Sequence, residues 1–294
     1  MIGKTAGVER FVEVEPGIRL WVTEAGDPAA EPLLLIMGAN APGLAWPEPL
    51  VDALAARHRV IRYDHRDTGR SSWPFDTDPY PLARLAEDAV AVLVALGVAR
   101  AHVAGMSLGG SLVQLLLVDH PERLLSATLW STAALGPWTP GAHPEASGLP
   151  SPDPALFELW EHLTDPRDRE ADLDFRVEHW RRLRGAGPFD PDEFRRQEER
   201  MISHAGRHDS PAAHARADPA GLERAADLNG ISTPTLVIDA PQDPVNPPPH
   251  AAYLASVIPG AELVTVPGLG HALGSDVLPA LTEAILRHTA THPG

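Results

Sequence analysis

Residues 101–118 read AHVAGMSLGGSLVQLLLV, and this stretch decides the fold. Its apolar start predicts a buried strand, Ala101–Gly105, and the run Leu108–Val118 predicts a helix directly after it. Ser107 stands at the turn between the two, in the pattern Gly-x-Ser-x-Gly. At so sharp a turn, side chains at the two glycine positions would collide with neighbouring elements. The pattern predicts a serine whose Oγ is exposed for nucleophilic attack. The alternative is a tight turn with a serine that caps the helix.

Backbone N–H groups beside this serine are candidate donors to an oxyanion. The turn aims the first free N–H groups of the helix, notably that of Leu108, at the space beside Ser107 Oγ. A second donor is expected after the apolar run Pro32–Met37, which leads into Gly38-Ala39-Asn40. The N–H of Ala39 is our candidate. A simple strand-terminating turn is the alternative.

Strand and helix patterns alternate on both sides of this stretch. Further strands are predicted at 10–14, 18–24, 32–37, 58–63, 125–130, 234–238 and 262–266. Further helices are predicted at 48–57, from about Pro81 to just before Gly97, at 249–257 and at 277–288. This alternation predicts an α/β fold with a mostly parallel central sheet flanked by helices.

The alternation stops between about residues 136 and 230. Pro-rich turns and charged helical stretches, Leu156–Leu163 and Pro191–Met201, replace the buried strands. We therefore expect residues 1–135 to form the first part of an α/β core, residues 136–230 an inserted helical cap, and residues 231–294 the second part of the core.

A nucleophilic serine needs a base and an acid, which in this chain order arrive as Asp or Glu and then His. The strand Pro234–Ile238 leads into Asp239 and Asp243, and the strand Glu262–Val266 leads into His271. Loops past the carboxyl ends of strands are where open α/β sheets place their sites. Asp243 is preferred because it lies at the loop tip, and Asp239 stays a competing acid. The structural alternatives are a turn-forming Asp243 and a surface histidine at 271.

Composition excludes several functions. The formal net charge is −16, from 24 basic and 40 acidic residues, which argues against nucleic acid and anionic membrane surfaces as partners. The absence of cysteine excludes disulfides, cysteine nucleophiles, iron–sulfur clusters and thiolate zinc sites. The start of the chain lacks the apolar block of a signal peptide, and no segment approaches a membrane span of about 20 apolar residues. We therefore expect a cytoplasmic protein.

Together these residues resemble the α/β-hydrolase fold family. The matching motifs are Met37-Gly38-Ala39-Asn40, Tyr63-Asp64-His65-Arg66-Asp67-Thr68-Gly69-Arg70-Ser71, Gly105-Met106-Ser107-Leu108-Gly109, Asp243-Pro244 and Gly270-His271. Most relatives carry His-Gly where this chain has Met37-Gly38. That variant is similar to the methylesterases of anthracycline biosynthesis, the aclacinomycin methylesterase type. The resemblance implies removal of a methyl ester from a polycyclic aromatic polyketide.

The predicted function is therefore hydrolysis of a hydrophobic, small-molecule carboxylic ester. Ser107 is the nucleophile, His271 the base and Asp243 the acid that orients it, with no cofactor or metal. A proline-iminopeptidase-like exopeptidase would share the triad but needs cap carboxylates for a substrate ammonium. A cofactor-free perhydrolase or C–C hydrolase would share the nucleophile. A binding module without turnover is the alternative from another class.

Three tryptophans of the predicted cap, Trp138, Trp160 and Trp180, are candidates for a substrate pocket. Flat aromatic surface suits a fused-ring ligand. The same rings could equally form the core of the cap, and both interpretations stay open.

Other polar clusters favour structural roles. Asp64-His65-Arg66-Asp67 is predicted to brace its loop through charged hydrogen bonds. His204 and His208 have zinc-ligand spacing on a helix, but they lack a third ligand and are predicted to be solvated. The charged runs 181–184 and 198–200 are predicted to be solvated helix faces.

Overall fold

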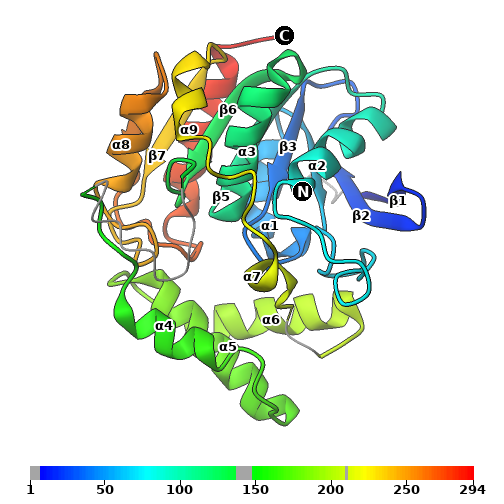
Figure 1. Ribbon diagram of the computed structural model, residues 1–294, viewed down its shortest axis with the longest axis vertical. Helices are drawn as coiled ribbons and strands as arrows, with labels where there is room; N and C mark the ends of the chain where they lie inside the picture. Colours follow the sequence, from blue (N-terminus) through cyan, green and yellow to red (C-terminus); the bar gives the residue numbers. More distant parts are fainter. Residues whose placement is uncertain (1–6, 137–147, 209–210) are drawn as a thin grey trace.

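The computed structural model describes residues 7–136, 148–208 and 211–294, and within them a central sheet carries helices on both faces (Figure 1). Its strands are β1 (Val8–Glu15), β2 (Ile18–Ala25), β3 (Pro32–Ile36), β4 (Arg59–Tyr63), β5 (Ala101–Met106), β6 (Leu124–Trp130), β7 (Thr235–Asp239) and β8 (Glu262–Thr265). They lie in the order β1-β2-β4-β3-β5-β6-β7-β8. The pairs β1–β2 and β2–β4 are antiparallel, and the others are parallel. The predicted α/β class with a mostly parallel sheet is confirmed.

Helices cover the two faces of the sheet. One face carries α2 (Arg84–Ala95), α3 (Leu108–Asp119) and α8 (His250–Val257), and the other carries α1 (Glu48–Ala55) and α9 (Leu278–Ala290). In β3, Leu34 and Ile36 belong to the first core, whereas Leu33 and Leu35 belong to the second. Successive strand residues point to opposite faces, so a strand covered on both sides is apolar throughout.

Predicted and observed boundaries differ by a few residues. The largest shifts are at α6, which ends at Ala205 instead of Met201, and at α2, which begins at Arg84 instead of about Pro81. The helix ends at Ala95, and Gly97 follows with a φ of +67°.

In the described part of the chain between β6 and β7 there are four α-helices, which we call the inserted helices, although these two strands are direct neighbours in the sheet. They are α4 (Pro154–Glu161), α5 (Arg169–Arg184), α6 (Pro191–Ala205) and the short α7 (Ala213–Arg216). Figure 1 shows α4, α5 and α6 together beyond one end of the sheet. The range of α5 was not predicted, since its sequence READLDFRVEHWRRLR has few apolar residues.

The inserted helices and their flanks are hydrogen-bonded to loops that follow the carboxyl ends of β3, β4, β7 and β8. The pairs are Gln197 with Ala45, His204 with Asp64, Asp153 with Pro244, and Leu183 with His271. These helices therefore lie over the edge of the sheet where parallel strands present functional side chains.

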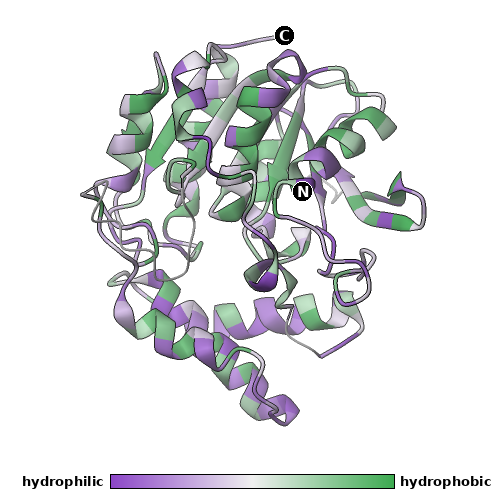
Figure 2. Cartoon of the chain, in the orientation of Figure 1, coloured by the Kyte–Doolittle hydropathy of each residue, from purple (hydrophilic) through white to green (hydrophobic). Residues whose placement is uncertain are grey.

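Figure 2 shows hydrophobic central strands, whereas α5 and α6 mix hydrophilic and hydrophobic residues. The prediction that both charged runs in these helices are solvated is wrong for one charged residue in each. Arg184 and Glu198 are buried, while their neighbours Arg182 and Glu199 are exposed. The buried charges have partners from distant parts of the chain, described below.

Candidate active site

Ser107 lies at the turn between β5 and α3 with a φ of +55° and a ψ of −126°. A Cβ atom added to Gly105 would lie 2.4 Å from the carbonyl oxygen of Gly109, and one added to Gly109 would lie 2.1 Å from that of Ile36. Both contacts are too close for any side chain. The two glycines therefore permit the turn that presents Ser107 Oγ.

The structure brings Ser107, His271 and Asp243 together, although 164 positions separate the first two. The Nε2 atom of His271 lies 3.0 Å from Ser107 Oγ. Its Nδ1 atom lies 3.0 Å from Oδ1 and 3.1 Å from Oδ2 of Asp243. The arrangement has the geometry of a hydroxyl nucleophile, a base and an orienting carboxylate.

The competing acid, Asp239, has a different partner. It ends β7 and accepts a hydrogen bond from Thr265 Oγ1 at 3.2 Å. Asp243 is buried and also accepts the N–H groups of Val245 and Asn246. Burial raises the pKa of Asp243, but His271 and these N–H donors outweigh it and hold the pKa below its usual value. Asp243 therefore faces the histidine as a carboxylate.

The turn that carries Ala39 lies beside the serine, since a Cβ atom added to Gly38 would be 3.2 Å from Ser107 Cβ. Among the described residues, no acceptor takes the N–H of Ala39. The N–H of Leu108 is at the first position of α3, where a helix leaves it without an intrahelical acceptor. Both predicted donors are thus available near Ser107.

Two buried histidines fix this turn. His65 Nε2 donates to the carbonyl of Met37 at 2.9 Å, and the N–H of Asn40, which has a φ of +58°, donates to His214 Nδ1 at 2.9 Å. Burial lowers the pKa of His65. Burial and the nearby His65 lower the pKa of His214 to about 3. Both rings stay neutral near pH 7. Sequence reasoning missed His214, because its contact with Asn40 joins residues 174 positions apart.

The predicted loop-bracing role of residues 64–67 agrees with the hydrogen bonds in the structure. Arg66 makes a bidentate ion pair with Asp88, with both N–O distances at 2.6 Å. Asp64 accepts the N–H groups of Gly43 and Arg70, each at 2.8 Å. These side chains hold the loop between β4 and α2.

The prediction that His204 is solvated is wrong. Its side chain is 7% exposed, and Nε2 lies 2.7 Å from Oδ2 of Asp64. His208 is exposed and lies beyond the end of α6 at Ala205, so the two histidines do not share a helical face. No cluster of three potential metal ligands occurs among residues 7–136, 148–208 and 211–294.

The carboxyl end of α5 contacts the loop that carries His271. We call residues Leu183–Gly185 the α5 clamp. The carbonyl of Leu183 accepts the N–H of His271 at 2.8 Å. The fully buried guanidinium of Arg184 donates to the carbonyl of Gly268 and to Asp276. The clamp therefore contacts the loop on both sides of the histidine, at the Gly268 carbonyl and at the Asp276 carboxylate.

Glu198 of α6 is buried beneath α5. Its carboxylate accepts the indole N–H of Trp180 at 2.5 Å and an N–H of Arg176 at 3.3 Å. Burial raises the pKa of Glu198, and the charge of Arg176 opposes that rise. This carboxylate links α5 to α6.

The structure describes two of the three candidate pocket tryptophans; Trp138 lies outside the described residues. Trp160 and Trp180 are half-buried and pack in a cluster with Leu183 and with Ala272, the neighbour of His271. Their rings contribute to the packing of the inserted helices and lie next to the histidine loop.

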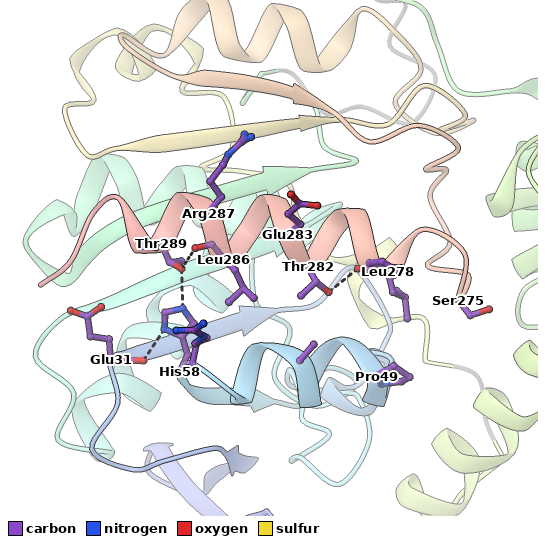
Figure 3. A pocket seen from close by; sticks show the side chains of 14 residues that line it. Glu31, Pro49, His58, Ser275, Leu278, Thr282, Glu283, Leu286, Arg287 and Thr289 are labelled. Carbon is purple, nitrogen blue, oxygen red and sulfur yellow. Dashed lines mark hydrogen bonds between the residues drawn. The ribbon is translucent and has the colours of Figure 1, made fainter. Parts of the chain in front are cut away.

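A groove of about 880 Å³ lies between α1 and α9 (Figure 3). Its lining includes His58, Leu278 and Arg287, and it contains none of Ser107, Asp243 and His271. It is thus separate from the triad.

Among the described residues, the helices are all too short or too polar to cross a membrane.

Comparisons with known proteins find a matching family model and related proteins that cover most of the chain. A model of the α/β-hydrolase fold family matches residues 31–276. The chain is 46% identical over 283 residues to rhodomycin D methylesterase DauP from Streptomyces sp. (strain C5), covering 92% of this chain and 95% of the relative. Rhodomycin D methylesterase DnrP from Streptomyces peucetius is 45% identical with the same coverage. A solved hydrolase from Pseudomonas aeruginosa PA01 is 30% identical with a TM-score of 0.73, covering 97% of this chain and 99% of that one.

Proposed function

The chain belongs to the α/β-hydrolase fold family, and on that premise we propose that it hydrolyses a carboxylic ester with Ser107, His271 and Asp243 as its catalytic triad. The observation that carries the proposal is the continuous hydrogen-bonded series from Ser107 Oγ through the His271 ring to the buried Asp243.

In this mechanism, Ser107 Oγ attacks the carbonyl carbon of the ester while His271 Nε2 takes the hydroxyl proton. Asp243 keeps the proton of the neutral ring on Nδ1, so Nε2 is free to act as base, and it stabilises the imidazolium that forms. His271 then gives the proton to the departing alkoxide. Water, activated by the same ring, hydrolyses the acyl-enzyme and regenerates the serine.

The tetrahedral oxyanion would accept the N–H groups of Leu108 and Ala39. Donors of this kind contribute about 3–4 kcal/mol each to the transition state. His65 and His214 hold the Ala39 turn by its flanking backbone groups, so the donor is in place before substrate arrives. Every step uses groups of this chain and water.

The proposed substrate is the methyl ester of a polycyclic aromatic polyketide. Support comes from the 45–46% identity to two rhodomycin D methylesterases over nearly the whole chain. In this proposal, residues 136–230 form a cap over the core parts 1–135 and 231–294, and Trp160 and Trp180 offer aromatic surface next to the histidine loop.

For the exopeptidase alternative, the paired state of Glu198 makes this one carboxylate unsuited to bind a substrate ammonium, and a proline-arylamide assay tests the activity itself. That activity needs a carboxylate free to bind a substrate ammonium, whereas Glu198 already has Arg176 and Trp180 as partners. Recruiting it would leave the Arg176 charge without its buried partner.

Two assays test the proposal. A fluorophosphonate probe should label the wild-type protein and fail to label Ser107→Ala, and the wild type should release methanol from rhodomycin D. Labelling that survives Ser107→Ala would contradict the mechanism. Labelling of the wild type without methanol release would contradict the substrate and leave the triad standing.

A further inference from the structure

A second histidine lies close to the proposed triad. His179 is on α5, one turn before Leu183, whose carbonyl accepts the N–H of His271. Residues four apart on a helix share a face, so His179 is on the side of α5 that meets the histidine loop. Nothing in the proposed mechanism uses its ring.

The tautomer of His179 is fixed by Trp160. The indole Nε1 of Trp160 lies 3.1 Å from His179 Nε2. An indole N–H only donates, so Nε2 must accept, and a neutral imidazole then carries its proton on Nδ1. Trp160 is itself held in the cluster that contains Leu183 and Ala272. The ring of His179 is therefore both oriented and committed to one tautomer.

The imidazole stays neutral during turnover. Burial and then the nearby His271 lower the pKa of His179 to about 4. At neutral pH, His179 thus presents an uncharged N–H donor and adds no positive charge beside the catalytic base.

The Nδ1 donor has no partner in the part of the chain that the structure describes. Nδ1 is also accessible. The ring is half-buried, and the fully buried polar atoms without a partner do not include His179 Nδ1. The neighbouring side chains Trp160, Trp180 and Leu183 are mainly apolar. A single oriented donor in apolar surroundings is the type of group that fixes the orientation of a ligand.

We propose that His179 is a substrate-binding residue whose Nδ1–H donates to an oxygen on the ring system that carries the ester. The inference rests on the proposed function, since the ester must be held at Ser107 for His179 to orient it. The acceptor would be a quinone carbonyl or phenolic oxygen of the acyl part, so His179 would select oxygenated aromatic esters over plain aromatic ones.

The test compares two esters of similar shape, methyl 1-hydroxyanthraquinone-2-carboxylate and methyl anthracene-2-carboxylate. His179→Leu should lower kcat/KM for the anthraquinone ester about tenfold, the loss expected for one hydrogen bond, and leave the anthracene ester nearly unchanged. His179→Asn, whose amide nitrogen replaces Nδ1, should retain most of the preference. His208→Leu removes an exposed histidine of the same region and should match the wild type on both esters.

Equal losses on both esters for His179→Leu, or no loss on the anthraquinone ester, would overturn the inference. Labelling by a fluorophosphonate distinguishes this failure from failure of the proposed function. If the wild type is labelled at Ser107 and His179→Leu keeps the ester preference, only the role of His179 is wrong. If the wild type is not labelled, the triad is wrong.

Discussion

At the scale of single residues, two carboxylates near the end of β7 differ in their hydrogen-bond partners. Asp243 accepts the His271 ring and two backbone N–H groups, whereas Asp239 accepts a threonine hydroxyl on the next strand. Only the first can keep the histidine in the tautomer that leaves Nε2 free to take the proton of Ser107.

Asp243→Asn should therefore lower kcat about 10⁴-fold, as the same change does in a serine protease triad, because an amide favours the wrong tautomer of His271. Asp239→Asn is the matched control and should stay within a few-fold of the wild type. Methanol release from the methyl ester measures both. The opposite ranking of the two variants would assign the acid to Asp239.

Local pattern was enough to predict Ser107, because a nucleophilic turn constrains the residues on either side of it. Chain order then predicted Asp243 and His271 as its partners, and the structure places the three side chains in one hydrogen-bonded series. Neither local pattern nor chain order predicts that His204 and Arg184 are buried. Their partners, Asp64 and Asp276, lie far away in the sequence. From sequence alone, a charged residue is predicted to be solvated when no partner for it lies in the same segment.

At the scale of elements, the α5 clamp joins an inserted helix to the loop that carries His271. Arg184 is fully buried, and its guanidinium bonds to Gly268 and Asp276 on either side of the histidine. The end of α5 thus forms part of the support of the proposed base.

Arg184→Met should lower the free energy of unfolding by about 2–3 kcal/mol, since the Gly268 carbonyl loses its donor and Asp276 its partner. It should also lower kcat more than it raises KM, because His271 loses its fixed position relative to Ser107. Urea unfolding and steady-state kinetics measure these effects.

Arg182→Met is the control for this substitution, because Arg182 is exposed on the same helix and its side chain pairs with the exposed Glu178. Its effect on stability should not exceed about 0.5 kcal/mol. If the two variants behave alike, the clamp does not support the histidine.

At the scale of the whole molecule, buried histidines make stability depend on pH. Burial lowers the pKa values of His58, His65, His102, His214 and His288, in several cases with a neighbouring histidine adding to it; those of His102 and His214 fall to about 4 and about 3. The unfolded chain binds protons at these sites near pH 6.5, while the folded chain does not. Stability is therefore full above pH 6.5 and is lost as the pH falls below it.

Between pH 7 and pH 5.5, His102 and His214 alone should lower the free energy of unfolding by about 1 kcal/mol each. Urea unfolding at both pH values measures the change. His102→Gln should show a smaller pH dependence, because one titrating site is removed. A midpoint that does not move over this range would mean that the buried rings take up protons as readily in the folded protein as in the unfolded chain.

The order of strands and helices along the chain predicted the parallel sheet, because buried parallel strands are apolar throughout. The position of the inserted helices relative to the sheet could not be predicted in the same way. It depends on hydrogen bonds such as those from His204 to Asp64 and from His271 to Leu183, which join segments with unrelated local patterns.

One contact of the α5 clamp limits how the inserted helices could be exchanged with those of a relative. Gly185 has a φ of +69°, and a Cβ atom there would lie 2.1 Å from the carbonyl oxygen of Gln242, beside Asp243. The clamp thus packs between the loop that carries Asp243 and the loop that carries His271. A chimera that borrows only the helices of a relative to change its substrate range would disturb both loops at once. The transplanted unit has to include residues 240–246 and 268–276 together with the helices.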